Sequence, residues 1–368
     1  MSFFEQMAER DHEQLVVCYD EVSGLKAIIG IHNTTLGPAL GGCRFWNYAT
    51  EEEALTDVLR LSRGMTYKSA AAGLNLGGGK AVIIGDPKKL KSEHLFRAYG
   101  RFVQGLNGRY ITAEDVGTTV QDMEWVRMET DHVTGISRAL GGSGDPSPVT
   151  ALGVFEGMKA SLKWHTGSES LAGKTIAVQG VGHVGYHLVK YMHNDGAKIV
   201  MCDIDDENLK RVSTDFPDVK TVGIDDIYDV ECDVYAPCAL GGTVNSDTIP
   251  RLKCQIIAGS ANNILKDEEQ DAKSLRKAGI LYAPDYVVNA GGLINVANEL
   301  EGYNRERALQ QASGIYDIMM NIFQIARDED ISPHRAANAL AERRIQKIGG
   351  IKDTYVKTQV HRRNRGKG

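Results

Sequence analysis

Short apolar runs alternate with helical patterns through the first 135 residues of the chain. Runs rich in β-branched residues predict four buried strands, at 15–19, 25–32, 81–84 and 110–112. A turn at Ser23-Gly24 separates the first two strands. The three glycines at 77–79 are expected to form a loop before the third strand.

Two amphipathic helices are expected between these strands. The first begins after Thr50, because Glu53 follows three residues later and the pair can form a capping box. Its apolar residues repeat with helical spacing, and Gly64 is expected to end it. The second helix is expected at about 92–106.

The second half of the chain shows a regular alternation of strands and helices. Six apolar runs predict strands, at 175–179, 198–202, 219–222, 233–236, 255–258 and 280–283. Because helical segments separate them, they are expected to form a doubly wound parallel sheet. Residues 141–148 (GGSGDPSP) form the clearest break in the chain, since such a segment cannot hold a helix or a central strand. Helices are expected at about 150–164 and beyond residue 291.

The patterns therefore predict an α/β protein with two domains, and composition narrows the class further. Glycine contributes 40 of 368 residues, but 42% apolar residues and only 9 prolines exclude a disordered or collagen-like chain. The net charge of −6 opposes binding of nucleic acid by the bulk of the protein. We expect a cytoplasmic protein with no membrane span or signal peptide, and scattered reduced cysteines rather than a zinc site.

A glycine-rich loop carries the clearest functional signal. It follows the predicted strand 175–179, opens a helical pattern, and reads Gly180, Val181, Gly182, His183, Val184, Gly185. In such a loop the glycines permit a tight turn, close approach of a pyrophosphate and close helix–strand packing. Asp203 ends the next strand, where a carboxylate binds the ribose and repels a 2′-phosphate, which favours NAD over NADP. The alternative is a glycine-rich turn without a ligand.

Two lysines and an acidic pair are candidates for catalysis. Lys80 lies between the three glycines and a buried strand, and Lys68 lies among small and apolar residues. Partial desolvation of such an amine lowers its pKa and suits it to act as a general base or to stabilise charge. Glu114 and Asp115 follow the strand at 110–112. The alternatives are ordinary solvated lysines and a helix N-cap.

These motifs together resemble the Glu/Leu/Phe/Val amino-acid dehydrogenase family. Six motifs occur in the family's order: 38–45 (PALGGCRF), 64–83 (GMTYKSAAAGLNLGGGKAVI), 112–118 (TAEDVGT), 180–185, 259–263 (GSANN) and 289–299 (NAGGLINVANE). The resemblance is closest to the branch that includes the leucine, valine and phenylalanine enzymes. It implies that residues 1–145 bind substrate, that residues 146–330 bind NAD, and that the active site is a cleft between these two domains. It also implies that about 331–368 pack back on the first domain.

The resemblance also implies roles for individual residues. Lys80 would assist attack of water, Lys68 would bind the substrate α-carboxylate, and Asp115 would relay protons to and from the amino group. Thr150 is expected near the nicotinamide carboxamide, and Asn262 near the substrate and the nicotinamide ribose. The other residues that the resemblance places beside the substrate are Gly41, Gly42 and Met65.

One position indicates an apolar substrate side chain. Glutamate dehydrogenases carry a lysine before the Gly-Gly pair, and this chain has Leu40 there. An apolar residue cannot neutralise a second substrate carboxylate, which would be costly to bury unpaired. Family likeness suggests a pocket wall of Leu40, Ala113, Leu293 and Val296.

The resemblance implies NAD-dependent, reversible oxidative deamination of branched-chain L-amino acids to 2-oxo acids and ammonia, by a homo-oligomer that is commonly an octamer. No metal, membrane or nucleic-acid partner is expected, although His183 and His187 have metal-ligand spacing. The alternatives are a valine or phenylalanine dehydrogenase and a non-catalytic NAD-binding regulatory protein. A basic tail at 352–368 leaves nucleic-acid binding as a further alternative.

Overall fold

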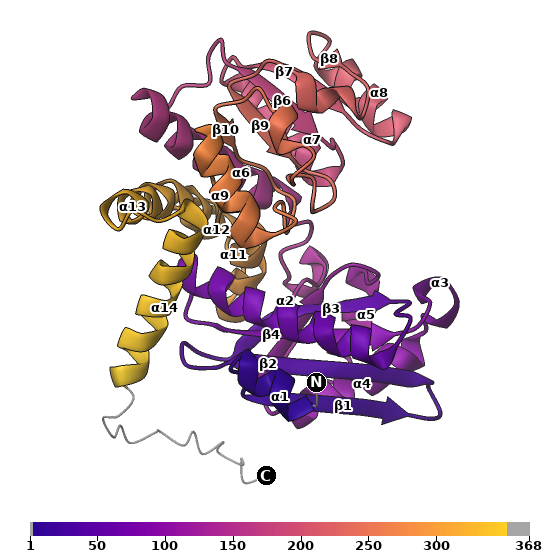
Figure 1. Ribbon diagram of the computed structural model, residues 1–368. Coiled ribbons are helices and arrows are strands. Elements are labelled where there is room, and N and C mark those ends of the chain that lie inside the picture. Colours follow the sequence, from indigo (N-terminus) through magenta and orange to yellow (C-terminus); the bar gives the residue numbers. More distant parts are fainter. Residues whose placement is uncertain (1–2, 352–368) are drawn as a thin grey trace.

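The computed structural model describes residues 3–351 and shows two α/β units, one built from each half of the chain (Figure 1). The first unit contains a five-stranded sheet in the order β1-β2-β4-β3-β5. Its strands are β1 (Gln14–Asp20), β2 (Leu25–Asn33), β3 (Ala39–Trp46), β4 (Gly77–Ile84) and β5 (Tyr110–Glu114). Strand β3 runs parallel to both β4 and β5, whereas β2 is antiparallel to β1 and β4. The four strands predicted from sequence are confirmed.

Five helices belong to the first unit: α1 (Phe3–Glu9), α2 (Glu51–Ala71), α3 (Pro87–Leu90), α4 (Glu93–Gly105) and α5 (Val120–Arg127). The side chain of Thr50 caps α2 by accepting a hydrogen bond from the Glu53 amide at 3.1 Å. The prediction that Gly64 ends this helix is wrong, since α2 continues to Ala71. Glycine costs a helix only about 1 kcal/mol, and the buried side chains beyond it offset that cost by packing on the sheet.

The expectation that residues 77–79 form a loop is also wrong. All three glycines belong to β4, in the middle of the sheet. A Cβ on Gly78 would lie 2.1 Å from the Thr66 backbone nitrogen, and a Cβ on Gly77 would lie 2.0 Å from the Asn33 carbonyl oxygen. The glycines therefore allow α2 and β2 to approach the β4 backbone more closely than any other residue would.

The second unit contains a six-stranded, fully parallel sheet in the order β11-β10-β9-β6-β7-β8. Its strands are β6 (Thr175–Gln179), β7 (Lys198–Cys202), β8 (Lys220–Thr221), β9 (Val234–Pro237), β10 (Ile256–Ile257) and β11 (Leu281–Tyr282). The predicted doubly wound sheet is confirmed. Strands β7 and β8 are added on one side of β6, and β9, β10 and β11 on the other, so the strand order switches between β6 and β9. Ligands of such sheets bind at the carboxyl ends of the strands at this switch point.

Helices pack around this sheet and extend back to the first unit. They are α6 (Ser147–Thr166), α7 (His183–Asn194), α8 (Asp206–Asp215), α9 (Glu268–Ala278), α10 (Asp285–Val288), α11 (Gly291–Ala297), α12 (Arg305–Ser313), α13 (Ile315–Asp328) and α14 (Pro333–Ile351). Short 3₁₀ turns occur at Arg138–Leu140, Asp226–Asp229, Ile249–Arg251 and Asn298–Glu301. Helix α14 contacts both α13 and α2, and it runs down beside the first unit (Figure 1).

The domain boundaries near residues 145 and 330 stay predictions. The basic segment 352–368 lies outside the described residues. Within residues 3–351 no helix is both long enough and apolar enough to cross a membrane.

Candidate active site

A cavity of about 430 Å³ lies between the two units, and its walls come from both. It is lined by every residue expected beside the substrate: Leu40, Gly41, Gly42, Met65, Lys68, Lys80, Ala113, Asp115, Asn262, Leu293 and Val296. Four of the residues expected at the cofactor line the same cavity: Asn262, already named, and Thr150, His183 and Val184. Residues that are distant in sequence therefore meet at one site.

Lys80 and Asp115, which both line this cavity, form an ion pair. Lys80 lies on β4 and is only 6% exposed, and its Nζ contacts Oδ2 of Asp115, which follows β5. A Cβ on Gly42 would lie 2.7 Å from the Asp115 Cβ, so glycine leaves the space that the carboxylate occupies. Burial alone would raise the pKa of Asp115, but the charges of Lys80 and Arg44 hold it below its ordinary value.

Lys68 approaches the cavity from the last turn of α2. Its Nζ donates a hydrogen bond to Oδ1 of Asn262 at 3.3 Å, and it makes no ion pair with any carboxylate among residues 3–351. Burial is the largest influence on this amine and lowers its pKa to about 8. Because α2 continues past Gly64, Lys68 is held on a helix and not on a loop.

Asn262 connects the two units and is itself held by Asn289. The side-chain amide of Asn289 donates to Oδ1 of Asn262 at 2.8 Å and to the Ser260 carbonyl at 3.1 Å. Asn289 follows α10, is 6% exposed and lines the cavity. The sequence reasoning assigned no role to Asn289, although a polar residue within the apolar run 286–294 could have drawn attention to it.

One wall of the cavity is apolar. Leu40 on β3 packs with Leu293 of α11 in a buried cluster that also contains Leu76 and Ile111. Met65 and Val296 are partly buried against this cluster. A ligand side chain placed against this wall would meet hydrocarbon, which favours an apolar group.

The glycine-rich loop has the geometry of a dinucleotide site. Gly180 has a φ of +95°, and a Cβ on Gly185 would lie 2.2 Å from the Gly180 carbonyl oxygen. Gly182 has open space around it and precedes α7 without any side-chain cap. The first amides of α7 are thus available to an anion, as a pyrophosphate requires.

Asp203 lies beside this loop. Its Oδ2 accepts a hydrogen bond from the Val181 amide at 2.7 Å, and its Oδ1 accepts one from the Asp205 amide at 2.9 Å. A carboxylate has about four acceptor positions, so two ribose hydroxyls can still bind to it. The residues present therefore fit an adenosine dinucleotide.

Two family models match most of the chain. "Glu/Leu/Phe/Val dehydrogenase, dimerisation domain" matches residues 12–132, and "Glutamate/Leucine/Phenylalanine/Valine dehydrogenase" matches residues 141–208 and 203–349. The chain belongs to the Glu/Leu/Phe/Val dehydrogenase family. The resemblance drawn from the six motifs is confirmed, and the family consists of dinucleotide-dependent dehydrogenases.

Named members of the Glu/Leu/Phe/Val dehydrogenase family cover almost the whole chain. A leucine dehydrogenase of Thermoactinomyces intermedius is 60% identical over 359 residues, which are 98% of each chain. A valine dehydrogenase of Streptomyces virginiae is 52% identical, over 91% of this chain and 94% of that protein. The crystal structure of L-tryptophan dehydrogenase from Nostoc punctiforme is 46% identical, covers 95% of this chain and 100% of the other, and gives a TM-score of 0.84.

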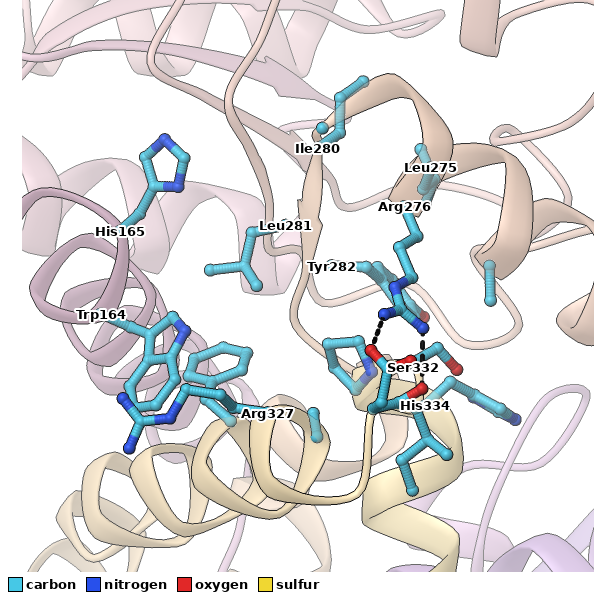
Figure 2. Close-up of a pocket in the computed structure, with 17 residues that line it drawn as sticks. Trp164, His165, Leu275, Arg276, Ile280, Leu281, Tyr282, Arg327, Ser332 and His334 are labelled. Atoms are coloured by element: carbon cyan, nitrogen blue, oxygen red, sulfur yellow. Dashed lines mark hydrogen bonds and ion pairs between the residues drawn. The ribbon is translucent and has the colours of Figure 1, made fainter.

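A second cavity of similar size has a different chemistry. It measures about 450 Å³ and lies between α6, α9, α13 and α14 (Figure 2). Its arginines are already engaged: Arg276 pairs with Asp330, and the Arg327 guanidinium lies 5.0 Å from the centre of the Trp164 ring. None of the motif residues of the Glu/Leu/Phe/Val dehydrogenase family lines it. The second cavity therefore lacks the residues that the resemblance places at an active site, whereas the cavity between the two units contains them.

Proposed function

We propose that the protein is an NAD-dependent L-amino-acid dehydrogenase that converts L-leucine and other branched-chain L-amino acids to 2-oxo acids and ammonia, reversibly. The proposal rests on one observation, the meeting of Lys68, Lys80 and Asp115 in a single cavity with an apolar wall. The names of the similar proteins, among which are leucine and valine dehydrogenases, support the same reaction.

The geometry suggests how the substrate is held. The α-carboxylate binds the Lys68 ammonium, and the side chain lies against Leu40 and Leu293. This orientation directs the α-amino group toward Asp115. Its carboxylate stays ionised at neutral pH despite burial, because the charges of Lys80 and Arg44 oppose the rise in pKa that burial would cause. Asp115 can therefore accept a proton from the amino group and leave a neutral amine.

Lys80 and Asp115 complete the deamination. Bound NAD supplies the acceptor for the hydride that leaves Cα, which turns the amine into an iminium. Lys80 then assists the addition of one water molecule to that carbon. The added water gives up one proton to solvent and leaves a hydroxyl on that carbon. Asp115 returns its proton to the nitrogen, the C–N bond breaks, and the hydroxyl proton leaves with ammonia as ammonium, so that the 2-oxo acid stays bound to Lys68. Reductive amination is the same sequence in reverse.

The preference for NAD over NADP is part of the proposal. The Asp203 carboxylate suits ribose hydroxyls and repels a 2′-phosphate. We further propose that the protein works in the cytoplasm as a homo-oligomer of eight subunits. A dimerisation-domain match over residues 12–132 supports assembly.

The test compares two lysine variants, each of which removes a lysine that pairs with an aspartate. Lys80→Ala is expected to abolish leucine-dependent reduction of NAD, followed by absorbance, while NAD binding measured by fluorescence survives. Lys174→Ala is the control, because Lys174 pairs with Asp233 at 2.9 Å at the start of β6, away from the cavity. Substantial turnover by Lys80→Ala would refute the role of Lys80.

A substrate panel on the wild type tests the rest of the proposal. We expect leucine, isoleucine and valine to be oxidised with NAD faster than phenylalanine, and glutamate to be rejected. A preference for phenylalanine would instead identify the alternative member of the family. Binding of NAD without turnover of any amino acid would identify a regulatory protein.

A further inference from the structure

Arg44 lies directly behind the candidate catalytic pair. It belongs to β3, next to β4, which carries Lys80, and next to β5, which precedes Asp115. Its Nε is 3.6 Å from Oδ2 of Asp115, the same carboxylate oxygen that contacts Lys80. Arg44 does not line the cavity between the units, so it would not touch a substrate there.

The other end of the guanidinium is anchored. Nη1 of Arg44 donates to Oδ2 of Asp57 at 2.9 Å, and the Tyr48 hydroxyl donates to the same oxygen at 2.7 Å. Asp57 lies on α2, and its second oxygen accepts from Arg60 at 3.1 Å. A chain of charges therefore runs from α2 through Arg44 to Asp115 and Lys80.

In this arrangement the Nε–H of Arg44 is the donor that can interact with the Asp115 carboxylate. Within residues 3–351, Nε of Arg44 has no hydrogen-bond partner, although it is buried. A buried donor without a partner is unfavourable, and a shift of a few tenths of an ångström would bring it within hydrogen-bond distance of Asp115. Arg44 itself lines a separate surface cavity with Tyr48, Asp57 and Arg60, which gives its charge some access to water.

We propose that Arg44 is a positioning residue for Asp115, and that its guanidinium, anchored by Asp57, keeps the Asp115 carboxylate ionised and directed toward Lys80 and the substrate cavity. This proposal rests on the proposed function and deepens it. Burial alone would protonate Asp115 more easily, and two cations oppose that effect, Lys80 from the cavity side and Arg44 from behind. Arg44 thus helps Asp115 to begin the reaction as an ionised base.

Besides Arg44, other titratable groups surround Asp115, and the Arg44 variants leave them unchanged. They are Lys80 on β4, Cys43 on β3, Tyr48, Lys68 on α2, and Glu114 and Tyr110 on β5. Of the cations around Asp115, Lys80 and Arg44 have the strongest influence on its pKa.

The first experiment measures kcat/KM for leucine against pH. Arg44→Met keeps most of the side-chain volume and removes the charge, so the acidic limb is expected to move upward by about one pH unit or more. Arg44→Lys should return the limb toward the wild-type position, because the charge is restored. Arg60→Met is the matched control, since Arg60 touches Asp57 but not Asp115 and should leave the limb in place. An unmoved limb in Arg44→Met, or an equal shift in Arg60→Met, overturns the proposal.

The second experiment does not depend on turnover. Thermal unfolding at neutral pH is compared for wild type, Arg44→Met, Asp115→Asn and the double variant. We expect Arg44→Met to lower the midpoint clearly in the wild-type background and much less beside Asp115→Asn. Additive shifts would show that Arg44 does not act on the Asp115 charge. If the wild type oxidises no amino acid, the proposed function fails, and this cycle still decides the Arg44–Asp115 interaction.

Discussion

The packing of α2 on β4 makes Gly78 a position where a single added methyl group should disturb the structure severely. In Gly78→Ala the new Cβ would lie 2.1 Å from the Thr66 backbone nitrogen, 2.2 Å from the Thr66 hydroxyl and 2.6 Å from the Ser62 carbonyl oxygen. Two of these three atoms are backbone atoms of α2, which cannot rotate away. The helix itself has to move from the sheet.

The size of this movement follows from the distances. Ordinary contact of a Cβ begins at 3.4 Å, so α2 must retreat by about 1.3 Å at Thr66. Overpacking of this kind costs about 1–3 kcal/mol of stability. Lys68 lies two residues further along α2, whereas Lys80 lies two residues along β4, so the same movement separates the two amines of the site. A misplacement of about 1 Å can cost roughly 100-fold in rate.

The assay pairs Gly78→Ala with a glycine of the same helix. Gly64 is exposed, lies within α2 and has nothing within 4 Å of its added Cβ. Gly64→Ala should therefore stabilise the protein by up to about 1 kcal/mol through helix propensity. Urea unfolding and steady-state kinetics with leucine are measured for both variants. The reasoning is refuted if Gly78→Ala keeps wild-type stability and kcat/KM, or if the two alanines shift stability in the same direction.

Two further predictions concern basic side chains whose pKa is lowered by desolvation. The pKa of Lys68 is about 8 in the folded protein and 10.5 in the unfolded chain, so holding the lysine charged lowers the stability of the folded protein below about pH 8. Lys68→Met should therefore stabilise the apo protein at pH 7, and this gain should disappear as pH rises from about 8 to 10.5. Thermal unfolding at pH 7 and near pH 10.5 checks the prediction, and a gain that grows with pH would contradict it. His12 and His32 pack ring to ring at 4.7 Å, and burial lowers both pKa values from 6.5 to about 4, so stability should fall as pH drops from 6.5 to 4. The double variant His12→Gln/His32→Gln should show a flatter pH profile of the unfolding midpoint, and an unchanged slope would count against this assignment.

The sequence predicted the second unit better than the first because its pattern is local. Each of its strands is an apolar run followed by a helical segment, and the doubly wound sheet follows from that alternation alone. Strand β3 gave no such signal, since Gly41 and Gly42 interrupt it and the residues that fit a strand are few. Its place in the sheet depends on contacts with β4 and β5, which lie far along the chain.

The candidate site was predicted as a set of residues but not as an arrangement. The motifs named the residues that line the cavity, yet the helical position of Lys68 and the strand position of Gly77–Gly79 were missed. In both cases tertiary packing outweighs the local preference of glycine. Arg44 and Asn289 belong to quoted motifs, but their roles arise from partners such as Asp57 and Asn262, which sequence spacing does not reveal.

The walls of the cavity differ in how freely they can vary during evolution. The side built from β3 and β4 depends on glycines, because any larger residue there would push the strands apart. A Cβ on Gly41, for example, would lie 1.8 Å from the Gly79 carbonyl oxygen. Leu293 and Val296 on α11 pack into the apolar wall beside Leu40, and neither is a glycine that a backbone contact requires. Substitutions on α11 can therefore change which substrate side chain fits the cavity while Lys68 and Lys80 keep their positions. A selection for altered side-chain preference should accumulate its substitutions there.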